Sequence, residues 1–171
     1  MRADAEALYN ANHRGLFRYL CRAVGHVETA RDLTQDVFLR VSRSVIPAAS
    51  EGSLRGWLFQ IARNLALDHR RTGQRRPPAG PLTDTAVRPA SQETSLAVND
   101  ALAALADVDR DVFLMREVGG LGYDEIAAAC GLTSDAVRSR IHRARLQLRE
   151  RLSGQIAARR MAPMRRSGRN G

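Results

Sequence analysis

The chain has 171 residues, of which 44% are hydrophobic and 26% charged, and its formal net charge is +9. This composition is typical of a globular protein and excludes an intrinsically disordered one. No apolar run approaches the roughly 18 residues that a transmembrane helix needs, and the N-terminus lacks the apolar core of a signal peptide. We therefore expect a cytoplasmic protein.

The basic charge is distributed unevenly along the chain. Residues 134–171 contain eleven Arg and two acidic residues, whereas residues 1–133 contain sixteen of each and are neutral. This asymmetry predicts a polyanionic partner for the C-terminal part. All 27 basic residues are Arg, and we attribute the absence of Lys to a biased genomic base composition rather than to function.

The first 71 residues predict three helices. Apolar side chains recur at three- and four-residue spacing within residues 8–24, 30–41 and 54–71, the period of an amphipathic helix. Gly25 interrupts the pattern between the first two helices, and Ser53 is the predicted N-cap of the third. No segment alternates as a β-strand does, so this part is predicted to be all-α.

Residues 72–95 are predicted to form a flexible linker between two small domains, at residues 1–71 and 96–152. Four of the six prolines fall in this stretch, and it lacks apolar periodicity. Fully extended, a linker of about 20 residues spans at most roughly 70 Å. Residues 153–171 are predicted to form a disordered basic tail.

The second domain has the order of a helix-turn-helix. Lead-in helices are expected near residues 98–105 and 112–118, with Asp107 or Asp109 as the N-cap of the latter. A short helix at 123–130, a turn containing glycine and a long helix from residue 134 then follow. On the long helix a single apolar stripe is predicted to pack against Ile126 and Ala127; it comprises Val137, Ile141, Ala144 and Leu148.

Polar side chains near the start of the long helix are the candidate DNA-reading residues. They are Arg138, Ser139, His142 and Arg143. The N-terminal half of such a helix enters the major groove, where Arg pairs with guanine and Ser or His bonds base edges. Further arginines are expected to contact phosphates; these are Arg140, Arg145, Arg149 and Arg151. The alternative is a solvated, Arg-rich helix face without a ligand. DNA binding is favoured because the glycine turn, the apolar stripe and the position of Arg138 near the start of the helix all fit it.

No pattern of catalytic or metal-binding chemistry is found. Cys21 and Cys130 lie far apart on helical patterns and predict two buried thiols rather than a disulfide or a zinc site. The four His are dispersed, and nucleophile-elbow, HExxH and phosphate-loop motifs are lacking. We expect no cofactor, no metal and no small-molecule substrate. An enzyme of unrecognised class using Cys21 or His69 is the weakest alternative.

Four segments carry a family resemblance, one of which, ALAALADVDRDVFLMREV, resembles the helices that precede the family's helix-turn-helix. The segment GLGYDEIAAACGLTSDAVRSRIHRARLQLRERL resembles the domain with which extracytoplasmic-function (ECF) sigma factors of bacterial RNA polymerase read the −35 promoter element. ARDLTQDVFLRV and LRGWLFQIARNLALDHRR resemble the family's polymerase-binding helix and its −10 recognition helix. The resemblance implies a non-enzymatic sigma factor that binds core RNA polymerase and promoter DNA, with an anti-sigma protein as a further partner.

The same resemblance assigns roles to individual residues. Arg138, Ser139, His142 and Arg143 match the −35 helix. The −10 set is Asn64, Arg63, Asp68, Arg70 and Arg71. The polymerase-docking set is Asp32, Gln35, Asp36, Phe38 and Leu39. Reading melted DNA requires a polar group for a base edge and Arg for phosphates, which Asn64 and its neighbours supply. The sequence departs from the family pattern at Asp135 and Ala106. These departures affect which promoter is expected to be preferred, and not the assignment to the family.

A stand-alone helix-turn-helix regulator is the alternative to a sigma factor. It would bind duplex operator DNA as a dimer and without polymerase, whereas a sigma factor acts within the holoenzyme. The −10 and −35 elements lie about two duplex turns apart, roughly 70 Å at about 34 Å per turn. A linker of about 20 residues can just cover that distance, as a sigma factor would require.

Overall fold

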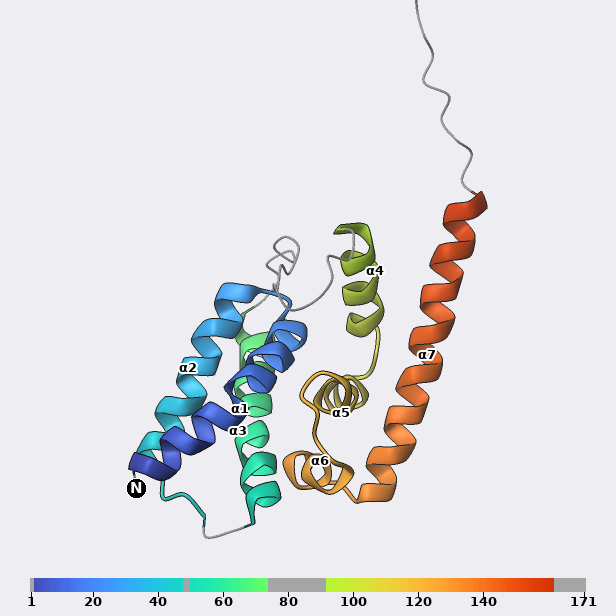
Figure 1. The fold of residues 1–171 in the computed structure, drawn as a ribbon. Coiled ribbons are helices and arrows are strands. Elements are labelled where there is room, and N and C mark those ends of the chain that lie inside the picture. Colours follow the sequence, from blue (N-terminus) through green and yellow to red (C-terminus); the bar gives the residue numbers. More distant parts are fainter. Residues whose placement is uncertain (1, 48–49, 74–91, 162–171) are drawn as a thin grey trace, which may run out of the picture.

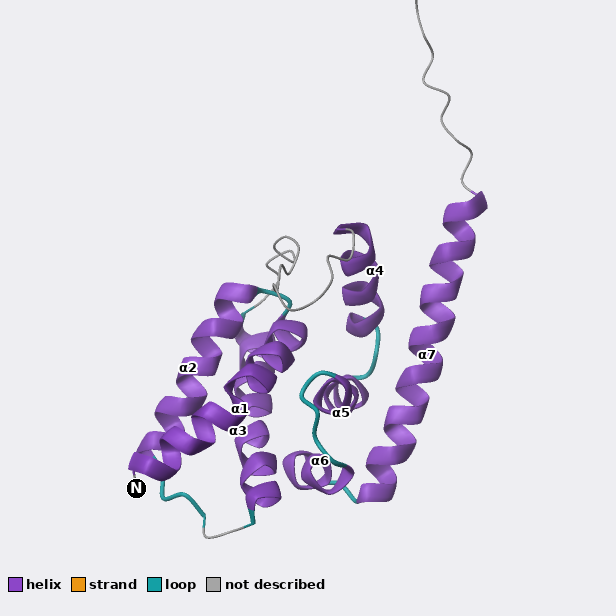
Figure 2. Ribbon diagram, viewed as in Figure 1, coloured by secondary structure: helices purple, strands orange, loops and turns teal. Residues whose placement is uncertain are grey.

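The computed structural model describes residues 2–47, 50–73 and 92–161. Within these ranges the chain forms helices and no strand (Figure 1 and Figure 2), which confirms the all-α prediction. The helices are α1 (Arg2–Val24), α2 (Val27–Arg43), α3 (Glu51–Thr72), α4 (Gln92–Ala103), α5 (Asp107–Glu117), α6 (Tyr123–Cys130) and α7 (Ser134–Met161). None of these helices is long and apolar enough to cross a membrane.

Helices α1, α2 and α3 pack together as an N-terminal bundle (Figure 1). The side chains that α2 buries are those of the predicted stripe: Ala30, Leu33, Val37 and Val41. His26 separates α1 from α2, because its Nδ1 accepts a hydrogen bond from the backbone N–H of Thr29 at 3.4 Å and so caps the new helix.

Helices α4 to α7 form the C-terminal half, and α6 and α7 are joined as a helix-turn-helix. Gly131 ends α6 at φ +65°, a left-handed conformation that glycine adopts without strain. Thr133 accepts a hydrogen bond from the N–H of Ala136 at 3.2 Å and caps α7. The predicted apolar stripe of α7 is buried together with Ile126 and Ala127, as the helical period requires.

Two predicted caps differ from the structure. Ser50, not Ser53, caps α3, since its hydroxyl oxygen accepts from the N–H of Ser53 at 3.4 Å and the helix begins a turn earlier than predicted. The N-cap of α5 is Ala106, without a side-chain hydrogen bond. Asp107 and Asp109 instead lie in the first turn, where a carboxylate is favoured by the partial positive charge of the helix N-terminus.

The ends of the predicted linker and tail are helical. Helix α4 begins at Gln92, inside the range 72–95 predicted as linker, and residues 74–91 lie outside the described residues. Helix α7 continues to Met161, although a disordered tail was expected from residue 153. Good helix formers such as Ala and Gln extend it, and Leu152 and Gln155 are half-buried. Residues 162–171 lie outside the described residues.

The two halves pack directly on one another. Helix α6 packs across α3, and α1 contacts α5 (Figure 1). Phe59 of α3 is fully buried, as is Tyr19 of α1, and the two ring centroids are 5.5 Å apart. Helix α3 is therefore covered on two sides, by its own bundle and by the helix-turn-helix.

Candidate nucleic-acid interface

The four predicted −35 residues form one exposed face at the start of α7. Arg138, Ser139, His142 and Arg143 are all exposed, and their spacing puts them on neighbouring turns of the same side. The guanidinium of Arg138 lies 5.2 Å from the ring centroid of Tyr123 and 3.7 Å from the carboxylate of Asp135. Its side chain remains 64% exposed, so the face is open to a large ligand.

Two of the arginines expected to contact phosphates are held by acidic partners of α5. Arg140 donates to Asp109 at 2.7 Å, and that carboxylate is almost fully buried. Arg145 donates to Glu117, and this hydrogen bond raises the pKa of Arg145. Arg149 and Arg151 are exposed. Arg140 is consequently a residue that fastens α7 to α5, in contrast to the exposed pair.

The predicted −10 set is divided by the structure. Asn64, Asp68 and Arg71 are exposed on α3. Arg63 and Arg70 are instead turned into the junction between the halves, where both guanidinium groups bind Asp111 of α5. Nε of Arg63 lies 2.9 Å from Oδ2, and Nη2 of Arg70 lies 3.4 Å from Oδ1. The exposed residues and the two paired arginines therefore face different surroundings.

Asp111 is a buried ionic residue that the sequence analysis did not single out. Its side chain is 0% exposed, and it lies one turn before the fully buried Met115. A carboxylate on an apolar helix face is the signal that a buried ionic partner exists. Burial raises the pKa of Asp111, while the charges of Arg70 and Arg63 lower it. Burial likewise raises the pKa of the neighbouring Tyr19 well above its usual value.

The predicted polymerase-docking set lies on α2. Asp32, Gln35, Asp36 and Leu39 are exposed. Phe38 is half-buried, because its ring packs edge-on against Tyr9 of α1 at a centroid distance of 4.7 Å. Tyr9 is itself exposed and stacks on His13 at 4.8 Å. This surface, which mixes acidic and apolar side chains, extends from α2 onto α1, and the sequence analysis did not include its α1 part.

Close backbone contact joins α3 to the helix-turn-helix. A Cβ atom added to Gly56 would lie 2.8 Å from the carbonyl oxygen of Glu125 in α6. Next to it, Arg55 donates to the carbonyl oxygen of Gly119 at 2.7 Å and lies 3.7 Å from the Glu125 carboxylate. Only glycine permits this approach without displacement of α6.

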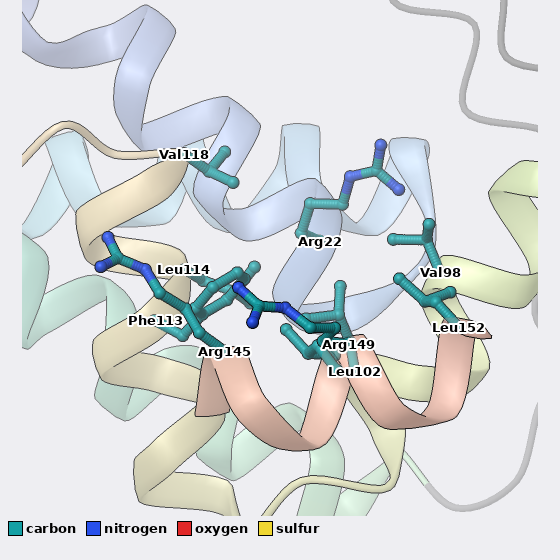
Figure 3. A pocket seen from close by; sticks show the side chains of 10 residues that line it. Arg22, Val98, Leu102, Phe113, Leu114, Val118, Arg145, Arg149 and Leu152 are labelled. Carbon is teal, nitrogen blue, oxygen red and sulfur yellow. The ribbon is translucent and has the colours of Figure 1, made fainter. Parts of the chain in front are cut away.

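A groove of about 440 Å³ crosses the junction between α1, α4, α5 and α7 (Figure 3). Its lining is mostly apolar, with Leu102, Phe113 and Leu152 among its side chains, and Arg22, Arg145 and Arg149 line it as well. Arg22 also donates to Asn99 of α4 at 3.1 Å. The groove therefore combines an apolar lining with cationic side chains. In the described part of the chain, His, Cys, Asp and Glu are nowhere grouped as metal ligands.

Comparisons with known proteins agree with this geometry. Residues 8–76 match the family described as sigma-70 region 2, and residues 95–148 match sigma-70 region 4. The chain is 30% identical over 162 residues to the RNA polymerase sigma factor YlaC of Bacillus subtilis, covering 89% of this chain and 94% of YlaC. It is 36% identical over 148 residues to the ECF sigma factor SigE of Mycolicibacterium smegmatis. That match covers 81% of this chain and 57% of SigE.

The chain belongs to the ECF-type sigma factors of RNA polymerase. The function of this sigma factor is thus to direct promoter-specific initiation of transcription, as the resemblance implied. Two solved structures share its fold with a TM-score of 0.69. One is CnrH in complex with the cytosolic domain of CnrY, at 26% identity and with 90% of each chain covered. The other is Bartonella quintana RpoE in complex with the anti-sigma factor NepR, at 21% identity, covering 88% of this chain and 97% of RpoE.

Proposed function

We propose that the sigma factor reads the −35 element with the start of α7, captures the −10 element with α3, and docks on core RNA polymerase with α2. The exposed face of Arg138, Ser139, His142 and Arg143 is the single observation that carries this proposal. It lies in the N-terminal half of the second helix of a helix-turn-helix, the part that enters the major groove. The protein contributes binding and positioning, and no reaction of its own.

At the −35 element Arg138 and Arg143 are the base-reading candidates. Arg forms two hydrogen bonds with guanine O6 and N7, and such a pair discriminates against the wrong base. The exposed ion pair of Arg138 with Asp135 is weak in water, so DNA replaces it at small cost. Ser139 and His142 bond base edges or phosphates from the same face.

At the −10 element Asn64 is the base-reading candidate. Its exposed amide offers both a donor and an acceptor to the edge of an unstacked base. Arg71, exposed on the same helix, is the candidate contact to the phosphate backbone of the DNA. Arg63 and Arg70 complete the set when they exchange Asp111 for phosphate. Asp68 is exposed between these groups and limits how closely phosphate approaches.

The polymerase contact is assigned to the exposed acidic and apolar side chains of α2. Asp32, Gln35 and Asp36 present carboxylates and an amide, and Leu39 adds an exposed apolar group beside the half-buried Phe38. A polar rim around apolar side chains is the usual composition of a protein interface.

We further propose an anti-sigma protein as a partner, bound through an acidic amphipathic segment in the groove of α1, α4, α5 and α7. RpoE was solved with an anti-sigma factor, and the fold of this chain is similar. The apolar lining, with Arg22 and Arg149 beside it, is complementary to a helix with one apolar face and acidic flanks. Such a segment would contact α1 and α7 together and hold both halves.

In vitro transcription tests the function. The purified sigma factor is added to active core RNA polymerase with a library of genomic fragments, and transcripts are sequenced. We expect transcripts that start at a fixed distance downstream of shared −35 and −10 sequences. Absence of any sigma-dependent start site, together with tight operator binding by the protein alone, would favour the stand-alone regulator.

A further inference from the structure

Asp111 is bound mainly by the other half of the molecule. The carboxylate belongs to α5, and the two guanidinium groups that hydrogen-bond to it belong to α3. Arg63 and Arg70 are only 17% and 19% exposed in this pairing. Arg70 also reaches the backbone oxygen of Ala23 in α1 at 3.5 Å. The ion pairs therefore exist only while α3 and α5 stay together.

Gly56 provides a second, independent feature of the same junction. The backbones of α3 and α6 approach so closely at this residue that a Cβ atom would meet the Glu125 carbonyl oxygen at 2.8 Å and the Ala128 side chain at 3.4 Å. Gly56 is buried in the second turn of α3, and glycine within a helix weakens the helix itself. Its place is explained by contact with α6.

We propose that Asp111, together with the Gly56 contact, forms a latch that holds the two halves in a closed state and withholds Arg63 and Arg70 from −10 DNA. This inference rests on the proposed role of α3. The −35 face of α7 and the α2 surface are exposed in the closed state, so polymerase docking and −35 contact precede release of the latch. Phosphate oxygens of melted DNA then replace the Asp111 carboxylate as partners of the two arginines.

The exchange is physically balanced. Arg binds a carboxylate and a phosphate through the same pairs of N–H groups, so each guanidinium keeps its hydrogen bonds. Asp111 leaves the closed junction at the same time and becomes hydrated, which avoids a buried unpaired charge. The free sigma factor binds DNA through α3 only in the fraction of molecules that is open, and its apparent affinity falls by that fraction.

Gly56→Ala tests the latch without altering any charge. The substitution favours the α3 helix and forces α3 and α6 apart. Gly154→Ala is the matched control, because Gly154 lies on α7 with no neighbour near the added Cβ atom. The full chain is titrated into a 5′-fluorescein thymidine oligonucleotide, with anisotropy as the readout, and small-angle X-ray scattering gives the radius of gyration.

We expect Gly56→Ala to increase the radius of gyration and to raise the affinity for the oligonucleotide about tenfold, while Gly154→Ala changes neither. Adding Arg63→Gln and Arg70→Gln to Gly56→Ala should abolish the gain. Asp111→Asn should act like Gly56→Ala, and Asp100→Asn, at an exposed carboxylate of α4, is its control. Circular dichroism shows whether Asp111→Asn folds; if it does not, the result of Gly56→Ala decides.

Unchanged affinity and unchanged radius of gyration for Gly56→Ala would overturn the latch. An increased radius with unchanged affinity would overturn the masking of the two arginines. The proposed role of α3 is tested separately by Arg63→Gln in the holoenzyme. Normal open complexes there refute that role even if the halves separate as expected.

Discussion

Helices α3 and α7 are both rich in arginine, yet their cations lie in opposite surroundings. On α7 the arginines proposed to read DNA, Arg138 and Arg143, are exposed, and the ion pairs of Arg140 and Arg145 lie within the C-terminal half. On α3, Arg63 and Arg70 are half-buried against a carboxylate of the other half. An ion pair within one half does not depend on how the halves are arranged, whereas a pair between them does. If Arg63 and Arg70 bind DNA as proposed, their availability therefore depends on that arrangement.

The largest expected effect tests whether the two helices share one core. Leu58 on α3 and Ile141 on α7 are both fully buried, and truncation to alanine removes about 2–5 kcal/mol of unfolding free energy. If the halves unfold together, Leu58→Ala and Ile141→Ala should lower the midpoint of one shared transition in chemical denaturation. Two separate transitions, each sensitive to only one substitution, would show that the halves are independent.

Removal of Arg138 tests the exposed side of the comparison. Arg138→Ala should weaken binding of the holoenzyme to its −35 element by about 1–3 kcal/mol, while core polymerase binding is unchanged. Arg151→Ala, on the same helix and also exposed, is the control. It should weaken binding to all DNA sequences by the same factor. Equal losses for Arg138→Ala on native and altered −35 sequences would reduce Arg138 to a phosphate contact.

Removal of Asn64 tests the base-reading side of α3. Asn64→Ala should slow open-complex formation by up to about tenfold, the value of one or two net hydrogen bonds. Gln60→Ala, one turn earlier and also exposed, is the matched control. Permanganate footprinting of the melted −10 region measures the effect, and equal footprints for both variants would count against a special role of Asn64.

The smallest expected effect concerns the thiol of Cys130 in α6. Burial raises its pKa to about 11, so nearly all of the thiol stays protonated and alkylation by iodoacetamide at about pH 8 is slow. Because the reactive thiolate increases with pH, the rate should keep rising up to the pKa. In a Cys21→Ser background, Gly56→Ala should accelerate the reaction, followed by mass spectrometry; an unchanged rate would mean that Cys130 is not covered by α3.

Local features were predictable from the sequence, and contacts between the halves were not. The buried stripe of α2 and the helix-turn-helix follow from the helical period and a glycine turn, which depend on neighbouring residues. Cys21 is buried as predicted, whereas Cys130 is half-buried. The cap of α3 was ambiguous because Ser50 and Ser53 both suit that role.

The site residues divide in the same way. The exposed positions of Arg138 and Asn64 agree with the helix faces on which their spacing puts them. The pairing of Arg63 with Asp111 spans 48 positions and depends on how α5 meets α3. The burial of Phe59 on a second face of α3 has the same cause. No periodicity within one helix encodes which other helix will cover it.

The ring of Tyr123 has a consequence for the proposed role of Arg138 at the −35 element. It lies under the guanidinium groups of Arg116 and Arg138, at 4.8 and 5.2 Å from the ring centroid. A long side chain loses rotational freedom when it binds, and that entropy normally opposes association. Tyr123 restricts Arg138 before DNA arrives. If Arg138 reads the −35 element as proposed, part of this entropy loss already occurs during folding, and Tyr123 then affects how tightly a promoter is bound.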